Sequence, residues 1–395
     1  MSGTRRNAWE KGRSEPIPAN FLRFSNPFSG LFGGSGDKSG NSIIAIDFGS
    51  SGAKVIQLRR DKGRIVLETY GEIATGPYVG MSVGQAVNLG LDKMTEVVTD
   101  LLRESNVTSK NAAIAIPLRS SLLMVLDIPT LSKNDLATAV PTEARRFIPV
   151  PISEVYLDWW IIPEREDISP AYEEKTPDKK MQEVLIAAIH RDTVGLYQNL
   201  AQKLALSSNT YEIETFSLIR SAMQNDLSAT AIIDLGAGTT KMAIVDYGVV
   251  RVSHTINKGA QDISVALSKS LSISFEKAEE IKRKVGLVEE ITSEGDIREV
   301  VSPVVEYIFE EVNRVIVAYQ KKHTVAVEKV ILVGGGSQLR GILDLAKKSL
   351  QMNVVIGSPF DKMETPAFLD KVLAVAGPSF AVTIGLALRK LEELG

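Results

Sequence analysis

Residues 231–245 read AIIDLGAGTTKMAIV, and the rest of the chain is interpreted around them. They predict a strand at Ala231–Leu235, a glycine-rich turn at Gly236–Thr240 and a second strand at Lys241–Val245. Glycines in such a turn let the backbone approach a ligand and point N–H groups at an anion. Asp234 would face the phosphates of such a ligand; because like charges repel, its role would be to hold Mg²⁺ through water. An ordinary β-hairpin is the alternative.

Two further glycine turns follow a similar plan. Residues 43–58, IIAIDFGSSGAKVIQL, place Asp47 before a Gly49–Gly52 turn and Lys54 after it, and Asp47 and Asp234 are 187 positions apart. Residues 330–341, VILVGGGSQLRG, form an apolar strand that runs into three consecutive glycines. Three such turns predict a ligand that is held from two sides and covered by a third loop.

This order of turns resembles the phosphate-1, phosphate-2 and adenosine loops of the actin, Hsp70 and sugar-kinase superfamily. Within it the chain is similar to FtsA-like proteins and most similar to the PilM family, actin-like ATPases of type IV pilus assembly. The closer resemblance rests on residues 143–155, EARRFIPVPISEV, with Leu157-Asp158 after them, and on residues 380–389, FAVTIGLALR. It covers residues 42–395 and leaves the first forty outside.

The resemblance implies an α/β protein with the actin-like ATPase fold, in which two lobes surround a nucleotide cleft and lobe 1 carries an FtsA/PilM-type 1C insertion. The alternation of apolar segments with helices also favours α/β layers. The expected parts are a disordered tail (1–40), lobe 1 (1A, 41–117 and 208–228, with a C-terminal helix at 378–395), the 1C insertion (118–207), lobe 2 (2A, 229–262 and 325–377) and subdomain 2B (263–324).

The resemblance further implies ATP and Mg²⁺ as cofactors, with the metal held through water by Asp47 and Asp234. Lys54 could instead be a solvent-facing strand residue, and Glu279 and Lys282 an exposed i, i+3 pair. The expected nucleotide-binding residues, from three turns and one helix, are Asp47, Gly49, Ser50, Ser51, Lys54, Asp234, Gly236, Gly238, Thr239, Thr240, Glu279, Lys282, Gly334, Gly335 and Gly336.

Hydrolysis would require a group that positions water against the terminal phosphate. Glu214, at the family position between the lobes, is the candidate for this catalytic role; a strand-end carboxylate without a role is the alternative. Because no motif supplies a strong base, we expect nucleotide binding and at most slow ATP hydrolysis.

Composition limits the other function classes. The net charge of −3 gives no reason to expect nucleic-acid binding. The absence of cysteine excludes disulfides and thiolate metal sites, and His190, His254 and His323 show no ligand spacing. No apolar signal segment is visible at the N-terminus. Val372–Leu388 is expected to be a packed helix that starts at Pro378, not a membrane span.

Residues 1–40 are rich in Gly, Ser, Asn and Pro and predict a disordered tail. Phe21, Phe24, Phe28 and Phe32 recur within it at helical spacing. A linker with incidental aromatic residues is one interpretation of this pattern. A segment that docks to a membrane or a partner is the other.

Local signals also describe the expected insertion. Ser132 predicts a helix start, with Asp135 as its capping-box partner. Pro141 predicts a kink, or a restart of that helix near Thr142. A helix at Asp192–Leu204 is expected to close the insertion, and the charged, proline-containing residues 164–180 predict a solvated loop.

The insertion carries the expected partner site. Prolines on both sides of Val150 favour an extended backbone, and Ile148, Val150 and Ile152 would line a groove for a short apolar peptide. PilM proteins receive the cytoplasmic N-terminal tail of the inner-membrane protein PilN. The resemblance therefore implies a PilN-like partner and a cytoplasmic protein held peripherally at the inner membrane. An ordinary buried loop is the alternative.

The expected function is an ATP-binding scaffold or switch in the assembly of a type IV pilus or a related type II secretion system. Contacts with other pilus motor components and self-association stay open. An FtsA-like division protein is one alternative, which would call for a C-terminal amphipathic membrane helix. A small-molecule kinase is another, which would need an aspartate base and a sugar pocket.

Overall fold

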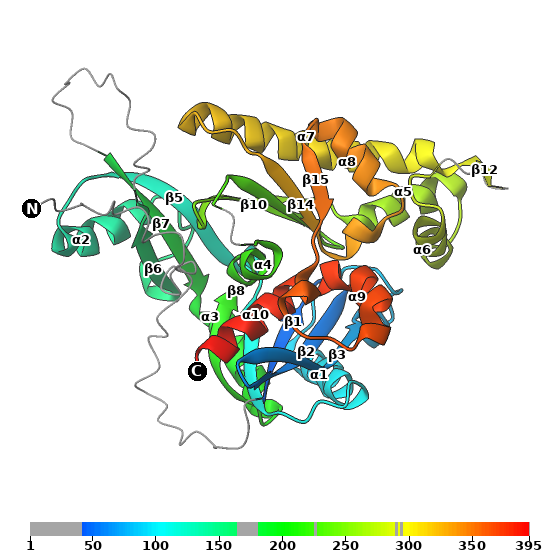
Figure 1. Ribbon diagram of the computed structural model, residues 1–395, viewed down its shortest axis with the longest axis horizontal. Coiled ribbons are helices and arrows are strands. Elements are labelled where there is room, and N and C mark those ends of the chain that lie inside the picture. The colour runs from blue at the N-terminus through cyan, green and yellow to red at the C-terminus, as the bar shows by residue number, and fades with distance from the viewer. Residues whose placement is uncertain (1–41, 164–180, 225–226, 289–290, 293–294, 395) are drawn as a thin grey trace, which may run out of the picture.

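The computed structural model describes residues 42–163, 181–224, 227–288, 291–292 and 295–394. Two lobes, each built on a five-stranded sheet, lie one above the other, and a smaller sheet stands at the side of the first lobe (Figure 1). This confirms the predicted two-lobed α/β architecture with an insertion. The phenylalanines of the tail and the predicted loop at 164–180 lie outside the described residues.

The two large sheets share one topology. The first contains β1 (Ser42–Phe48), β2 (Gly52–Asp61), β3 (Arg64–Ala74), β4 (Asn111–Ile116) and β8 (Ser207–Ile213). The second contains β9 (Thr230–Leu235), β10 (Thr240–Asp246), β11 (Val249–Ile256), β14 (Lys329–Val333) and β15 (Asn353–Ile356). The orders are β3-β2-β1-β4-β8 and β11-β10-β9-β14-β15, so each sheet joins three antiparallel strands to a parallel half. The repeated plan places both glycine hairpins at equivalent positions of their lobes.

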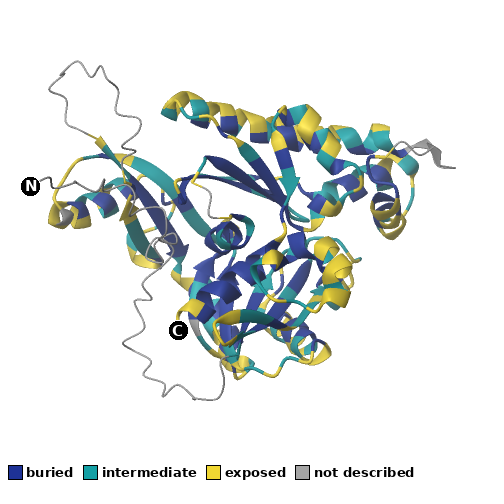
Figure 2. Ribbon diagram, in the orientation of Figure 1, coloured by how far each residue is buried: buried dark blue, intermediate teal, exposed yellow. Residues whose placement is uncertain are grey.

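The central strands are apolar along their length because both of their faces are covered. Residues 43–46 of β1 and 231–233 of β9 are fully buried, and the interior of each lobe is formed by such strands (Figure 2). The helices that cover the sheets are α1 (Leu91–Glu104), α3 (Arg191–Lys203), α4 (Glu214–Ala222) and α10 (Ala381–Glu392) in lobe 1, and α5 (Ala260–Leu271), α6 (Phe275–Lys284), α7 (Ile297–His323) and α8 (Ile342–Leu350) in lobe 2.

The helix near the C-terminus is a core element of lobe 1. The run Ala367–Glu392 is long and apolar enough to cross a membrane, but 67% of its most apolar window is buried inside the fold, as in the core helix of a soluble protein. The predicted helix start at Pro378 is wrong. The chain forms α9 (Asp370–Ala376) and a 3₁₀ turn (Gly377–Phe380) before α10, and Pro378 is the second residue of that turn, where its missing N–H costs little.

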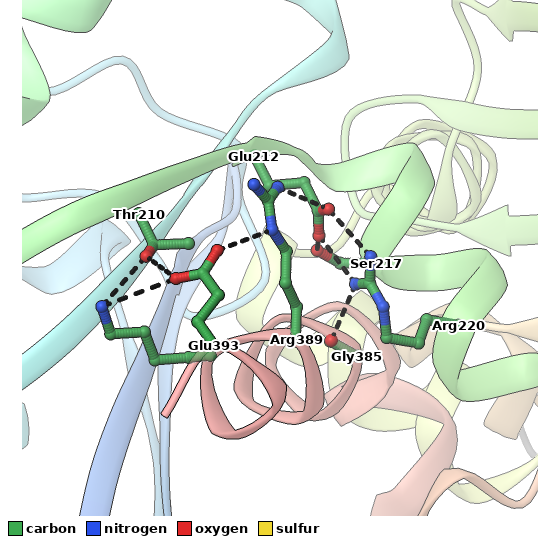
Figure 3. Close-up of polar contacts among 8 residues, drawn as sticks. Thr210, Glu212, Ser217, Arg220, Gly385, Arg389 and Glu393 are labelled. Carbon is green, nitrogen blue, oxygen red and sulfur yellow. Dashed lines mark hydrogen bonds and ion pairs between the residues drawn. The ribbon is translucent and has the colours of Figure 1, made fainter. Parts of the chain in front are cut away.

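A buried ion cluster holds α10 against α4 and the end of β8 (Figure 3). Glu212 is fully buried and accepts two hydrogen bonds from Arg220, at 2.8 and 2.9 Å, and one from Arg389 at 2.8 Å. The two helices cross so closely that a Cβ atom at Gly385 would lie 1.7 Å from the carbonyl oxygen of Ser217. Only glycine fits at this crossing.

The insertion is an antiparallel sheet of β5 (Ser121–Pro129), β7 (Met181–His190) and β6 (Val155–Ile161), in that spatial order, with its own core shared with α2 (Lys133–Ala144). Ser132 caps α2 as predicted, because its hydroxyl accepts the N–H of Asp135 at 3.3 Å. The predicted restart near Thr142 is not observed. The helix continues through Pro141 for one more turn, and the Thr142 hydroxyl donates to the Thr138 carbonyl at 2.9 Å.

The helix that was expected to close the insertion packs elsewhere. Val194, Tyr197 and Leu200 of α3 belong to the core of lobe 1, where α3 contacts α1 and β8. By packing, α3 therefore belongs with lobe 1, although the expected insertion ran to residue 207.

Candidate functional site

The two glycine hairpins carry the same pair of charges. Strand register places Asp47 opposite Lys54 in β1–β2 and Asp234 opposite Lys241 in β9–β10. In both hairpins the lysine follows the aspartate by seven positions. Lys54 was expected among the binding residues, whereas Lys241 was expected only as the first residue of a strand. The equal spacing was the signal that could have found it.

The two turns meet between the lobes. The N–H of Gly238 donates to the Ser50 hydroxyl at 3.3 Å. The N–H of Gly49 donates to the Gly52 carbonyl at 3.0 Å, and that of Gly236 donates to the Thr239 carbonyl at 3.1 Å. These three N–H groups are therefore engaged within the turns or between them. The expected donation to a ligand from these glycines would require exchanging those bonds.

Beside this junction lies a cavity of about 400 Å³ between the lobes. Most of the predicted binding residues line it: Asp47, Gly49, Ser50, Ser51, Lys54, Glu214, Asp234, Gly236, Thr239, Glu279, Lys282, Gly334, Gly335 and Gly336. Gly238 and Thr240 are not part of the lining. Thr240 is fully buried, and its hydroxyl donates to the Lys258 carbonyl at 2.9 Å, so it stabilises the hairpin from behind.

Acidic and basic groups gather at the floor of the cavity. Burial raises the pKa of Asp47 to about 6; the nearby Glu214 and Asp234 carboxylates also raise this pKa, while Lys54 and Lys241 lower it. The five groups therefore act on one another electrostatically. Within the described residues, no three His, Asp or Glu side chains are clustered as direct metal ligands.

Glu214 is not a strand-end carboxylate, because it is the first residue of α4. It is buried, its Oε1 accepts the N–H of Leu118 at 2.5 Å, and its Oε2 pairs with Lys241 Nζ at 2.6 Å. Burial lowers the pKa of Lys241, but the attraction of Glu214 and Asp234 outweighs it and raises this pKa overall. Lys241 is therefore a cation at neutral pH.

A second charged group lies at the α6 side of the cavity. Glu279 accepts hydrogen bonds from Ser264 at 2.6 Å, Lys282 at 2.6 Å and Arg283 at 2.7 Å. Glu279 and Lys282 are 6% and 7% exposed, so the alternative of an exposed surface pair is wrong. Lys282 also donates to the Ala260 carbonyl at 3.0 Å, which joins α6 to the start of α5.

The third glycine turn closes the cavity beside Asp234. Gly334 has φ +80°, and a Cβ atom there would lie 2.2 Å from Asp234 Oδ1. Its N–H donates to the Pro378 carbonyl at 2.8 Å, so this turn of lobe 2 is bonded to the segment that precedes α10. Glycine is required both by the backbone conformation and by the close approach to the carboxylate.

A separate hollow lies on the insertion and is lined by residues 145 and 148–153 alone. Ile148 is 7% exposed and belongs to the core of the insertion, while Val150 and Ile152 are half-buried at its surface. Phe147, next to the hollow in sequence, is 48% exposed. The three residues predicted for a partner groove thus lie together, with Ile148 serving mainly as core.

Comparison with known proteins places the chain in a family. The family described as type IV pilus assembly protein PilM matches residues 45–391. The chain belongs to the PilM family. This match spans both lobes and the insertion, including every predicted cavity and hollow residue.

Distant relatives of this PilM-family chain are cell division proteins FtsA. FtsA of Bacillus subtilis strain 168 is 22% identical over 87% of this chain and 82% of the relative. FtsA of Rhizobium meliloti strain 1021 is 27% identical over 40% of this chain and only 39% of the relative.

Solved structures show that the fold is actin-like. A structure described as the PilM–PilN type IV pilus biogenesis complex matches with a TM-score of 0.72 at 21% identity, over 88% of this chain and 98% of that one. MreB5 of Spiroplasma citri bound to AMPPNP matches with a TM-score of 0.50 at 13% identity, over 88% of this chain and 95% of that one. At these identities the likeness concerns the fold alone.

Proposed function

We propose that this chain binds Mg²⁺-ATP between its lobes and acts as a nucleotide-dependent scaffold in type IV pilus assembly. The observation that carries the proposal is the meeting of two Asp–Lys hairpins at one cavity of about 400 Å³. Lys54 and Lys241 attract an anion from both sides of this cavity, and a hairpin with only a structural role would not require a second, matching hairpin opposite it.

The cavity has two chemically different ends. The hairpin end holds Lys54 and Lys241 and suits the phosphates of a nucleotide. The turn at Gly334–Gly336 runs from Asp234 toward Ala260, which also contacts Lys282 of α6. At Gly335 no atom lies within 4 Å of a Cβ position, so the backbone there leaves room for a flat base. The MreB5 relative with AMPPNP bound in the same fold supports a nucleoside triphosphate as the ligand.

The residues at the hairpin end also fit a magnesium ion. Asp47 and Asp234 both line the cavity, and carboxylate oxygens with water are the ligands that Mg²⁺ takes. They would hold the ion through its waters. Three nearby carboxylates offset the positive charge of the two lysines, so the lysines alone do not balance the phosphates. A bound Mg²⁺ would neutralise the remaining phosphate charge.

Calorimetric titration with Mg²⁺-ATP tests this proposal. Asp234→Ala should weaken Mg²⁺-ATP binding by about tenfold or more, because a charge-assisted contact to the ion is lost. Asp92→Ala is the matched control, since the Asp92 side chain is 91% exposed on α1. Equal Mg²⁺-ATP affinity of the wild type and a folded Asp234→Ala variant would show that Asp234 does not hold the ion.

We further propose that the hollow at residues 148–153 receives the N-terminal cytoplasmic peptide of a PilN-like inner-membrane protein, which would hold this chain in the cytoplasm beside the inner membrane. Family membership and the fold shared with a PilM–PilN complex support this partner. The half-buried Val150 and Ile152 offer apolar contacts beside a proline-stiffened backbone. The distant FtsA relatives do not favour a division role.

Fluorescence titration tests the proposed partner site. The ligand is the N-terminal peptide of the bitopic membrane protein encoded beside the gene for this chain. The wild type should bind it saturably, and Val150→Asp should weaken binding because a charge would enter the apolar hollow. Val317→Asp, at a position on α7 that is 36% exposed, is the control for the added charge. Equal binding by wild type and Val150→Asp would exclude this hollow as the docking site.

A further inference from the structure

Lys241 connects the two lobes at the floor of the cavity. Its Nζ lies 2.6 Å from Glu214 Oε2 and 3.6 Å from Asp234 Oδ2. Glu214 opens α4 of lobe 1, whereas Lys241 lies on β10 of lobe 2. Because the second carboxylate oxygen of Glu214 accepts the N–H of Leu118, this carboxylate is anchored to lobe 1 while it holds the cation of lobe 2.

The pair is shielded from bulk water but open to a ligand. The side chains of Glu214 and Lys241 are 7% and 21% exposed, and both line the cavity. Lys54, the equivalent lysine of the other hairpin, pairs instead with Glu72, whose side chain is 48% exposed. The two hairpins are therefore equivalent in backbone but not in charge pairing, since only Lys241 is held by a buried carboxylate across the lobes.

We infer that Lys241 recognises the terminal phosphate of the bound nucleotide and exchanges Glu214 for a phosphate oxygen when that phosphate is present. The inference rests on the proposed function. A terminal phosphate carries more negative charge than a carboxylate, and an ammonium group donates readily to it. Asp234, at 3.6 Å, is the more distant partner of Lys241, and it would be one of the two carboxylates that hold the magnesium ion.

This exchange gives the lobes two states. Without a terminal phosphate, the Glu214–Lys241 pair joins lobe 1 to lobe 2. With it, both lobes attach to the nucleotide instead, and Glu214 is released at the floor of the cavity. A nucleoside diphosphate does not offer the terminal group, so it leaves the pair intact. Lys241 would thereby distinguish triphosphate from diphosphate.

The experiment compares the affinities of AMPPNP and ADP, each with Mg²⁺, by calorimetry. The wild type should prefer AMPPNP. Lys241→Met should lose about tenfold or more of its AMPPNP affinity with little change for ADP. Glu214→Gln should shift the preference the other way, toward AMPPNP, because the competing carboxylate charge is gone. Lys241→Arg should keep the preference, and Lys93→Met, which removes an exposed lysine on α1, should leave both affinities unchanged.

A merely structural pair predicts a different pattern, in which Lys241→Met and Glu214→Gln lower both affinities in parallel. That result overturns the inference, as does a wild type that binds AMPPNP and ADP equally well. A wild type that binds neither nucleotide overturns the proposed function itself. The double variant Glu214→Gln/Lys241→Met removes both members of the close pair, and Asp234 loses only its longer contact at 3.6 Å. The double variant should therefore fold and bind ADP but show no preference. A preference retained in the folded double variant also overturns the inference.

Discussion

Replacing Glu212 by glutamine should destabilise the protein more than any surface charge change. Glu212 is fully buried and faces the guanidinium groups of Arg220 and Arg389, whose side chains are 9% and 7% exposed. Glu212→Gln keeps the size of the side chain but removes the one buried carboxylate between two buried cations. Arg389 would keep its ion pair with Glu393 at 3.2 Å, whereas Arg220 would lose its carboxylate partner. Leaving a buried charge without its partner costs about 3–5 kcal/mol. Such a loss should lower Tm by on the order of 10 °C.

The pH dependence of this effect can be worked out from the cluster. Burial raises the pKa of Glu212, but Arg220 and Arg389 together lower it by more, so this pKa lies below its ordinary value of 4.5. Because the pKa of Glu212 is lower in the folded state than in the unfolded state, its ionised carboxylate stabilises the fold at any pH above its unfolded-state pKa. This stabilisation is lost as the pH falls through its folded-state pKa. The difference in stability between wild type and Glu212→Gln should therefore be constant above about pH 4.5 and shrink below it.

Thermal and urea denaturation between about pH 3 and pH 8, followed by circular dichroism, would measure both effects. Glu143→Gln is the matched control, because Glu143 forms an ion pair with one arginine, Arg146, and both side chains are exposed. Its loss should cost less than about 1 kcal/mol. A Glu212→Gln variant as stable as Glu143→Gln at neutral pH, or a difference that does not change with pH, would refute the assignment of a buried, charge-balancing role to Glu212.

The architecture was predictable because apolar strands and glycine turns are local signals. Residues 43–46 and 231–233 are buried strands that each lead into a turn. An apolar strand and the glycine turn after it can both be recognised from a single sequence, without knowledge of the tertiary contacts. β11, α5, α8 and β15 are among the elements that were not predicted. β11 mixes Val with Arg251, which is buried, and with His254 in its partly buried half. α5 begins at a cap in which the Gly259 N–H donates to Asp262 at 2.9 Å. β11 shows no regular apolar alternation, whereas α5 carries Ile263, Leu267 and Leu271 at helical spacing, a signal that was overlooked.

The charge pairing of the site was harder to predict because it depends on tertiary packing. Glu279 and Lys282 have the spacing of a surface pair, and only the contacts with Ser264 and Ala260 of α5 bury them. Glu214 and Lys241 are 27 positions apart on different lobes, so no local pattern relates them. The position of α3 was missed for a similar reason: chain order placed it in the insertion, while its apolar face fits lobe 1.

Two further predictions concern how the elements around the cavity are held. Gly385→Ala should lower Tm by several degrees in thermal denaturation. The added Cβ would lie 1.7 Å from the Ser217 carbonyl oxygen and force α10 away from α4. An unchanged Tm would mean that the two helices can move apart without loss of stability. Gln261→Ala concerns the opening of the lobes. The Gln261 Oε1 of α5 accepts the N–H of Ala86 at 2.9 Å, so a loop of lobe 1 is bonded to lobe 2 near the junction of the turns. A nucleotide that enters between the lobes must wait for this bond to break. Its removal should therefore raise the association and dissociation rates of a fluorescent ATP analogue together in stopped-flow measurements, with little change in Kd. An increase in the dissociation rate alone would show instead that the bond stabilises the bound state, because a contact that only limits access must affect both directions equally.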